Sequence, residues 1–103
     1  MHGRIARYGY AGNAQELAHR AEEGMLPIFE AKPGFRAYSI TESGGEIFSF
    51  SAWDSPEQAE AANAAAAEWV AANMGELELK EAHTGEILLS TSLGVTTMAG
   101  MSA

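Results

Sequence analysis

The chain has 103 residues, of which 14 are acidic and six basic, and its formal charge is −8. This length suits a single domain, and the charge argues against binding to nucleic acid or to an anionic membrane surface. The absence of cysteine excludes disulfides, thiolate nucleophiles and cysteine-ligated metals. There is no apolar leader after Met1 and no run of about 20 apolar residues, so we expect a cytoplasmic protein.

The first third of the chain predicts a strand followed by a helix. Residues 4–10 form the strand, and Ala11-Gly12-Asn13 provides a turn and a helix N-cap. In residues 14–29 the apolar side chains recur at helical spacing and form one stripe. Gly24 and Pro27 interrupt this stripe. Because proline lacks an N–H donor, we expect Pro27 to kink or divide the helix.

A Pro33-Gly34 corner then ends the helix and starts a pair of strands. The strands span residues 35–42 and 46–53, and the glycine-rich segment Ser43-Gly44-Gly45 forms the hairpin turn between them.

The second helix begins after Ser55, the predicted N-cap, with Pro56 at its first position and Gln58 placed to complete a capping box. It runs to about Met74. Nine of its 19 residues are alanine, which gives high helix propensity and a thin profile. The last strand is predicted over residues 80–90, with Ile87-Leu88-Leu89 as its most apolar part.

The order β-α-β-β-α-β predicts an α+β, ferredoxin-like domain with both helices on one face of a four-stranded antiparallel sheet. In the third strand Ile47 and Trp53 point to one face, while Phe48 and Phe50 point to the other. The second strand also carries apolar groups on both faces, with Phe35 expected opposite Tyr38 and Ile40. A sheet that is apolar on both faces needs a second cover, and we expect a homodimer.

Two segments are similar to a known family. They are the corner Pro33-Gly34-Phe35-Arg36 and the segment from Trp53 to Ala59. With the length and element order, they make the chain resemble the antibiotic biosynthesis monooxygenase (ABM) domain family of the dimeric α/β-barrel superfamily. The resemblance covers about residues 1–90 and leaves residues 91–103 as a tail. It implies a homodimer in which each protomer has a pocket between sheet and helices.

The family includes haem-degrading enzymes and cofactor-independent monooxygenases. The former carry a histidine ten residues after the third-strand tryptophan, where this chain has Asn63, and an asparagine on the first strand, which this chain lacks. Amides are poor iron ligands, so haem degradation is disfavoured. The resemblance to the monooxygenases places Trp53 at their tryptophan, and Ser49 where some of them have an asparagine. We therefore expect no cofactor and no metal.

Asn63 and Trp53 are the main candidate site residues. Asn63 lies on the apolar stripe of the second helix, where it either bonds the sheet or contacts a ligand. Trp53 either stacks on an aromatic ligand or fills the core. His83 is the best candidate base by residue type. Further candidate ligand-binding residues are Ser49, Tyr8, Tyr38, Arg36 and Trp69, although packing for Trp69 and an ion pair for Arg36 are the commoner roles.

Two functions remain open at this point. One is a cofactor-independent monooxygenase that acts on an electron-rich aromatic or quinol-type small molecule. The other is a non-catalytic dimeric module that binds a small hydrophobic ligand or serves in assembly. The sequence contains no complete catalytic set that separates the two.

Overall fold

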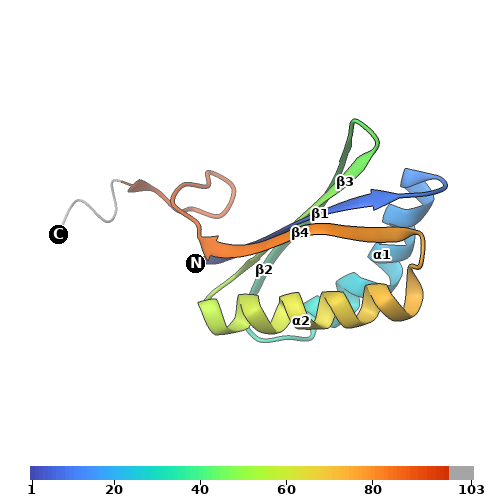
Figure 1. Ribbon diagram of the computed structural model, residues 1–103. Coiled ribbons are helices and arrows are strands. Elements are labelled where there is room, and N and C mark those ends of the chain that lie inside the picture. Colours follow the sequence, from blue (N-terminus) through green and yellow to red (C-terminus); the bar gives the residue numbers. More distant parts are fainter. Residues whose placement is uncertain (98–103) are drawn as a thin grey trace.

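The computed structural model describes residues 1–97 and has the predicted order of elements (Figure 1). The four strands form one antiparallel sheet in the order β2-β3-β1-β4, and both helices lie on the same face of it. The predicted ferredoxin-like architecture is therefore confirmed. No helix in this part of the chain is long and apolar enough to cross a membrane. The elements are β1 His2–Tyr10, α1 Ala14–Glu30, β2 Phe35–Ser43, β3 Glu46–Trp53, α2 Pro56–Asn73 and β4 Leu77–Glu86.

Side-chain caps fix where the helices begin. The Asn13 side chain accepts a hydrogen bond from the Glu16 N–H at 3.0 Å, and Ser55 accepts one from the Gln58 N–H at 3.2 Å. The capping box is not completed, because the buried side-chain oxygen of Gln58 has no hydrogen-bond partner within residues 1–97. The Gln58 side chain packs against Gly34 instead. Gly34 has a φ of 82°, so the corner requires glycine for its backbone as well as for space.

Pro27 lies inside α1 but does not divide it. The helix is continuous over 17 residues, and the carbonyl of Pro27 accepts a hydrogen bond from the Ala31 N–H at 3.1 Å. Of the two expected effects, a kink or a division, division therefore does not occur. Proline removes only its own donor, and the hydrogen bonds that follow keep the last turn helical.

A β-bulge in β2 changes which face of the sheet its first side chain points to, so the predicted orientation of Phe35 is wrong. Phe35 pairs with Trp53 but Ala37 pairs with the next residue, Ala52, so Arg36 is an extra residue in the strand. The bulge resets the alternation of side chains. Phe35 therefore packs against the same core cluster as Tyr38 and Ile40, where simple alternation had placed it on the opposite face.

The last strand begins and ends earlier than predicted. β4 pairs with β1 from Leu77, opposite Tyr10, to Glu86, opposite His2. Beyond His2 the neighbouring strand runs out, so only one further bond forms, from the Ile87 N–H to the Met1 carbonyl. Leu88 and Leu89 lie outside the strand and are exposed. Of the predicted tail, residues 91–97 continue past this end of the sheet (Figure 1), and residues 98–103 lie outside the described residues.

The two helices approach each other closely at Gly24 of α1. A Cβ atom at this position would overlap the indole of Trp69 on α2. The glycine that interrupts the apolar stripe of α1 therefore leaves the space that the indole of Trp69 on α2 occupies. The core has two clusters of buried residues, one containing Phe29 and Trp53 and the other containing Leu17 and Ile47, and Trp69 packs against both.

We predict that Gly24→Ala lowers the free energy of unfolding by about 1–3 kcal/mol, although alanine is the better helix former, because the Trp69 ring must move. Denaturant unfolding measures the change. Gly75→Ala is the matched control: a Cβ there meets no atom within 4 Å, and stability should change by less than about 0.5 kcal/mol. A Gly24→Ala protein more stable than wild type would contradict this packing.

Candidate functional site

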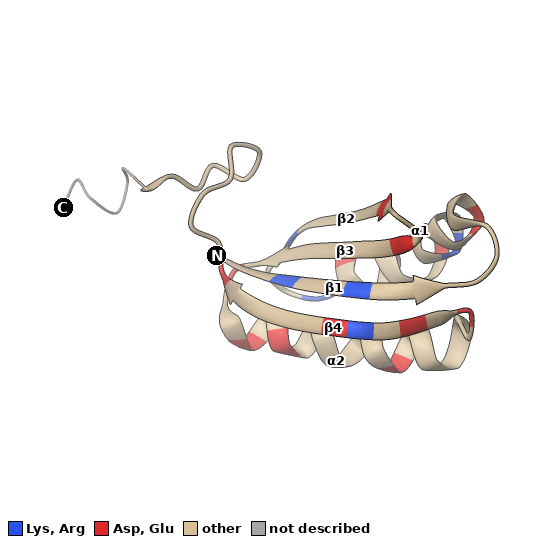
Figure 2. Ribbon diagram, turned by 45° about the horizontal axis from the view of Figure 1, so that its top comes forward, with Lys and Arg blue, Asp and Glu red and all other residues tan. Residues whose placement is uncertain are grey.

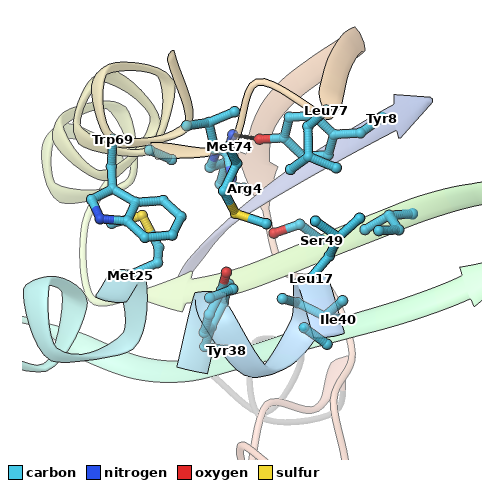
Figure 3. A pocket seen from close by; sticks show the side chains of 15 residues that line it. Arg4, Tyr8, Leu17, Met25, Tyr38, Ile40, Ser49, Trp69, Met74 and Leu77 are labelled. Atoms are coloured by element: carbon cyan, nitrogen blue, oxygen red, sulfur yellow. Dashed lines mark hydrogen bonds between the residues drawn. The ribbon is translucent and has the colours of Figure 1, made fainter. Parts of the chain in front are cut away.

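A cavity lies between the helix-covered face of the sheet and the two helices (Figure 3). The cavity is narrow: the space open to the centre of a water-sized molecule is about 30 Å³. Its polar lining consists of Arg4, Tyr8, Tyr38 and Ser49, all from the sheet. The remaining lining is apolar and comes mostly from the helices: Leu17, Ala18, Ala21, Met25, Ile40, Ile47, Ala66, Trp69, Val70, Met74 and Leu77.

β1 carries basic residues (blue in Figure 2). These are Arg4 and Arg7, and because they are three positions apart in a strand, their side chains lie on opposite faces of the sheet. Arg7 lies on the open face and pairs with Glu46 and Glu81, each at 2.6 Å. Arg4 lies on the helix-covered face, and only 1% of it is exposed. Of these two arginines, Arg7 therefore has two acidic partners at the surface, whereas Arg4 is buried inside the protein.

Neutral side chains hold the buried guanidinium of Arg4. Its Nε donates to Oδ1 of Asn63 at 2.8 Å, and its Nη2 donates to the hydroxyl of Tyr8 at 2.9 Å (Figure 3 shows the second bond). No carboxylate of residues 1–97 forms an ion pair with it. Because arginine keeps its positive charge in proteins, the cavity wall contains a buried cation without an anion.

The Tyr38 hydroxyl points into the same cavity (Figure 3). The pKa of Tyr38 is raised to about 12, mainly by burial and then by the neighbouring Tyr8, while Arg4 and Ser49 act in the opposite direction. At neutral pH the phenol therefore stays protonated and can donate a hydrogen bond. Its ring is held by an edge-on contact with Phe29, with centroids 5.0 Å apart.

Every polar group of the cavity can thus donate a hydrogen bond. Within residues 1–97 no carboxylate and no imidazole lines it. Such a site can stabilise negative charge on a bound molecule, because donors and a cation in an apolar environment act strongly on it. It supplies no side chain suited to act as a general base near neutral pH.

Asn63 makes the helix-to-sheet contact that was one of its two alternatives. Its side-chain oxygen accepts from Arg4, and the residue does not itself line the cavity. With that oxygen occupied and no histidine among the described lining residues, this site does not fit a histidine-ligated haem.

Trp53 is buried in the core beside the cavity. None of it is exposed, and its ring meets Phe29 and Phe35 edge-on at centroid distances of 5.3 and 5.4 Å. Its Nε1 donates to the hydroxyl of Ser51 at 2.9 Å. It is absent from the described lining, so in this structure it fills the core and has no free face on which a ligand could stack.

The structure brings together four of the other predicted residues, Ser49, Tyr8, Tyr38 and Trp69, in the cavity wall. Arg36 lies elsewhere, at the bulge, where its exposed side chain pairs with Asp54 at 2.6 Å.

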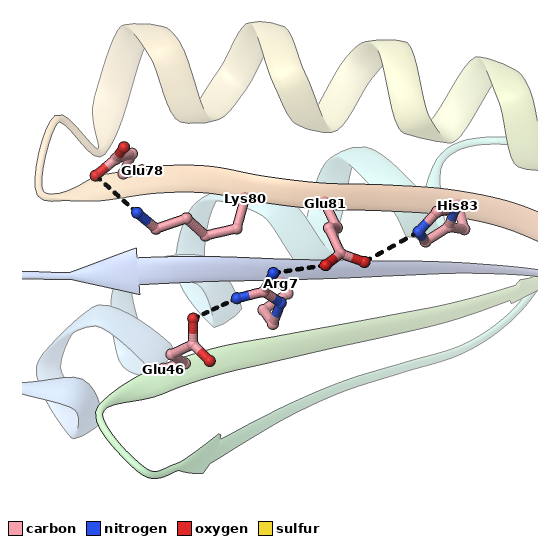
Figure 4. Close-up of polar contacts among 6 residues, drawn as sticks. All are labelled: Arg7, Glu46, Glu78, Lys80, Glu81 and His83. Atoms are coloured by element: carbon pink, nitrogen blue, oxygen red, sulfur yellow. Dashed lines mark hydrogen bonds and ion pairs between the residues drawn. The ribbon is translucent and has the colours of Figure 1, made fainter.

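His83 lies on the open face of the sheet, where it contacts Glu81 at 3.2 Å (Figure 4). It is thus on the opposite side of the sheet from the cavity. Residue type alone had made it the candidate base.

Sequence reasoning missed Arg4. A signal was present, since Arg4 alternates with Ala6 and Tyr8, so a charged residue shares a strand face with apolar neighbours. Pairing with β3 and β4 turns that face toward the helices, and all three side chains are at most 4% exposed.

Comparison with solved structures gives several matches to the whole fold. MupZ from Pseudomonas fluorescens has a TM-score of 0.66 at 8% identity, and the match covers 81% of this chain and 65% of MupZ. SnoaB, a cofactor-independent oxygenase from Streptomyces nogalater, has a TM-score of 0.68 at 13% identity, over 87% of this chain and 95% of SnoaB.

A third match is the monooxygenase ActVA-Orf6 of Streptomyces coelicolor, solved with nanaomycin D. Its TM-score is 0.60 at 21% identity, over 86% of this chain and 92% of that one. No protein-family model matches the sequence, and neither does any curated protein. The structural matches show that this chain has the fold of the antibiotic biosynthesis monooxygenase family.

Proposed function

We propose that this protein is a cofactor-independent monooxygenase that oxidises an electron-rich aromatic or quinol-type small molecule. The observation that carries the proposal is the cavity: apolar walls surround a small group of side chains that can all donate hydrogen bonds. SnoaB, which has the same fold, is a cofactor-independent oxygenase, and ActVA-Orf6 is a monooxygenase that was solved in complex with the ligand nanaomycin D. These neighbours support the proposal as precedents for the fold.

The cavity suits a reaction in which the substrate supplies the electrons. An anthrone-type substrate ionises to its enolate by giving a proton to solvent water, and the enolate passes one electron to oxygen. The resulting radical and superoxide combine to a peroxide anion, which takes a proton back from solvent. Loss of water from the hydroperoxide leaves a new carbonyl, so one CH₂ and one O₂ become C=O and H₂O. The hydrogen-bond donors stabilise the enolate, and the apolar walls keep water from the reactive intermediates.

A second function, non-catalytic binding of a small hydrophobic ligand, is favoured by one observation. Within residues 1–97 the cavity has no carboxylate or imidazole to take up a proton. A binding protein needs none, whereas the monooxygenase must bind a substrate acidic enough to ionise once it is beside the donors. Absence of oxygen uptake with a panel of anthrones and quinols, together with a thermal shift on adding one of them, would select this alternative.

We also propose that a second copy of the chain covers the open face of the sheet. Two aliphatic or aromatic side chains are exposed there, Ile5 by 53% and Phe48 by 38%. Beside them a chain of ion pairs crosses the sheet, in which Arg7 of β1 joins Glu46 of β3 to Glu81 of β4 (Figure 4). Protein interfaces combine apolar contacts with polar and charged groups of this kind.

The monooxygenase proposal predicts that the purified protein, in the presence of a metal chelator, consumes oxygen when given an anthrone or a quinol. Ala66→Met should lower kcat/KM by about tenfold or more, because Ala66 is 2% exposed and its side chain faces the cavity. Ala64→Met, on the exposed side of the same helix, is the matched control and should leave turnover unchanged. Equal activity in both variants would place the reaction elsewhere.

We further predict that Asn63→Ala lowers kcat/KM by about tenfold or more, because Arg4 loses the partner that holds its Nε. Asn73→Ala, three turns further along α2, removes an exposed amide that bonds only its own helix and should have little effect. Steady-state oxygen uptake measures both. Unchanged turnover in Asn63→Ala would rule out the role of this residue.

For the dimer we predict that sedimentation at micromolar concentration gives the mass of two chains, and that Ile5→Glu gives the mass of one. A carboxylate there would be buried at the proposed interface, where an unpaired charge is costly. Ile28→Glu, at a 37% exposed position on α1, should remain dimeric. A monomeric wild-type protein would overturn the proposed interface.

A further inference from the structure

We propose that the cavity binds its ligand as a monoanion, with a phenolate or carboxylate oxygen at Nη1 of Arg4. This inference rests on the proposed function only in placing the ligand in the same cavity. It assigns a charge to the ligand and a contact atom to the protein.

The first step is the contrast between Arg4 and the other three arginines of the chain. Arg7, Arg20 and Arg36 each have a carboxylate oxygen at 2.6 Å and are partly exposed. Arg4 is 1% exposed and has no carboxylate partner within residues 1–97. Burying a charge is costly unless an opposite charge accompanies it, so a buried arginine beside a cavity calls for an anion from outside the chain.

The second step is the geometry of the guanidinium. Asn63 of α2 holds Nε and Tyr8 of β1 holds Nη2, so two elements fix the plane of the group. The hydrogen bonds of Arg4 within residues 1–97 use these two atoms and leave Nη1 without a partner. Because the side chain lines the cavity, Nη1 is the donor that remains for a ligand. Asn63 and Tyr8 are thus positioning residues for Arg4.

The third step concerns the size of the negative charge. Arg4 is the only charged side chain among the described residues that line the cavity. One positive charge balances one negative charge, whereas a dianion such as a phosphate monoester would bring a second buried charge without a partner. The hydroxyls of Tyr8, Tyr38 and Ser49 add neutral donors, and the apolar walls suit a hydrocarbon body on the ligand.

The test compares two probes of the same shape, 2-naphthoate and its neutral amide, by calorimetric titration of the full chain. Wild type should bind the carboxylate at least about tenfold more tightly than the amide. Arg4→Gln should weaken naphthoate binding by at least about tenfold and change amide binding little. Arg20→Gln removes an equal charge from a surface ion pair and should behave as wild type.

A nitrophenol, whose phenolate form is yellow, provides the second arm and a readout that a purely structural role would not change. Bound to wild type, its apparent pKa should fall below that of the free probe, because Arg4 favours the phenolate. With Arg4→Gln the fall should disappear. If only the naphthoate experiment shows selectivity for the anion, the site binds carboxylates, and if only the nitrophenol experiment does, it binds phenolates. Selectivity in both experiments would show that the site recognises the anionic oxygen that the two probes share.

Three results would overturn the inference: binding of neither probe to wild type, equal binding of naphthoate and its amide, or selectivity that survives Arg4→Gln. If Arg4→Gln does not fold, the wild-type comparison of acid with amide and the wild-type colour shift still decide the matter. The two proposals fail separately. Anion selectivity without oxygen uptake would remove the monooxygenase and leave the anion site, whereas oxygen uptake with equal affinity for acid and amide would do the reverse.

Discussion

The hydrogen bond from Arg4 to Asn63 joins the centre of the sheet to the middle of α2, and the cavity depends on it. α2 faces the sheet mainly with the buried side chains of Ala59, Ala62 and Ala66, and of these three Ala66 lines the cavity. A thin helix of this kind leaves room for a cavity, and a polar contact in its middle fixes its position over β1. The same contact places a positive charge in the cavity wall.

The chemistry of the site follows from its side chains: among the described residues that line it, several can donate a hydrogen bond and none is a carboxylate or an imidazole. Tyr38 stays protonated far above neutral pH because it is buried, and the neighbouring cation is held by neutral groups. In the proposed reaction, a molecule that ionises readily is stabilised there as its anion, and the anion reacts with oxygen without a cofactor. His83 plays no part in this scheme, since it lies beyond the sheet with Glu81.

The element order, the N-caps and the Pro-Gly corner could be predicted because they depend on neighbours in the chain. Ser55 caps α2 and Pro56 follows it, as their spacing requires. The end of β4 and the face of the sheet to which Phe35 points could not be predicted, because they depend on the neighbouring strands. β1 ends at His2, so its pairing with β4 stops there, and a bulge at Arg36 shifts the alternation of side chains in β2. The role of Arg4 was hidden for the same reason, since only pairing shows which face of β1 the helices cover.

A crystal structure of the complex with 2-naphthoate tests the central claim most directly. The account predicts the naphthalene ring among the apolar side chains of the cavity wall, with a carboxylate oxygen within hydrogen-bond distance of Nη1 of Arg4. It also predicts that the contacts of Arg4 with Asn63 and Tyr8 are kept. A probe bound on the open face of the sheet, or one in the cavity with its carboxylate turned out to solvent, would contradict it.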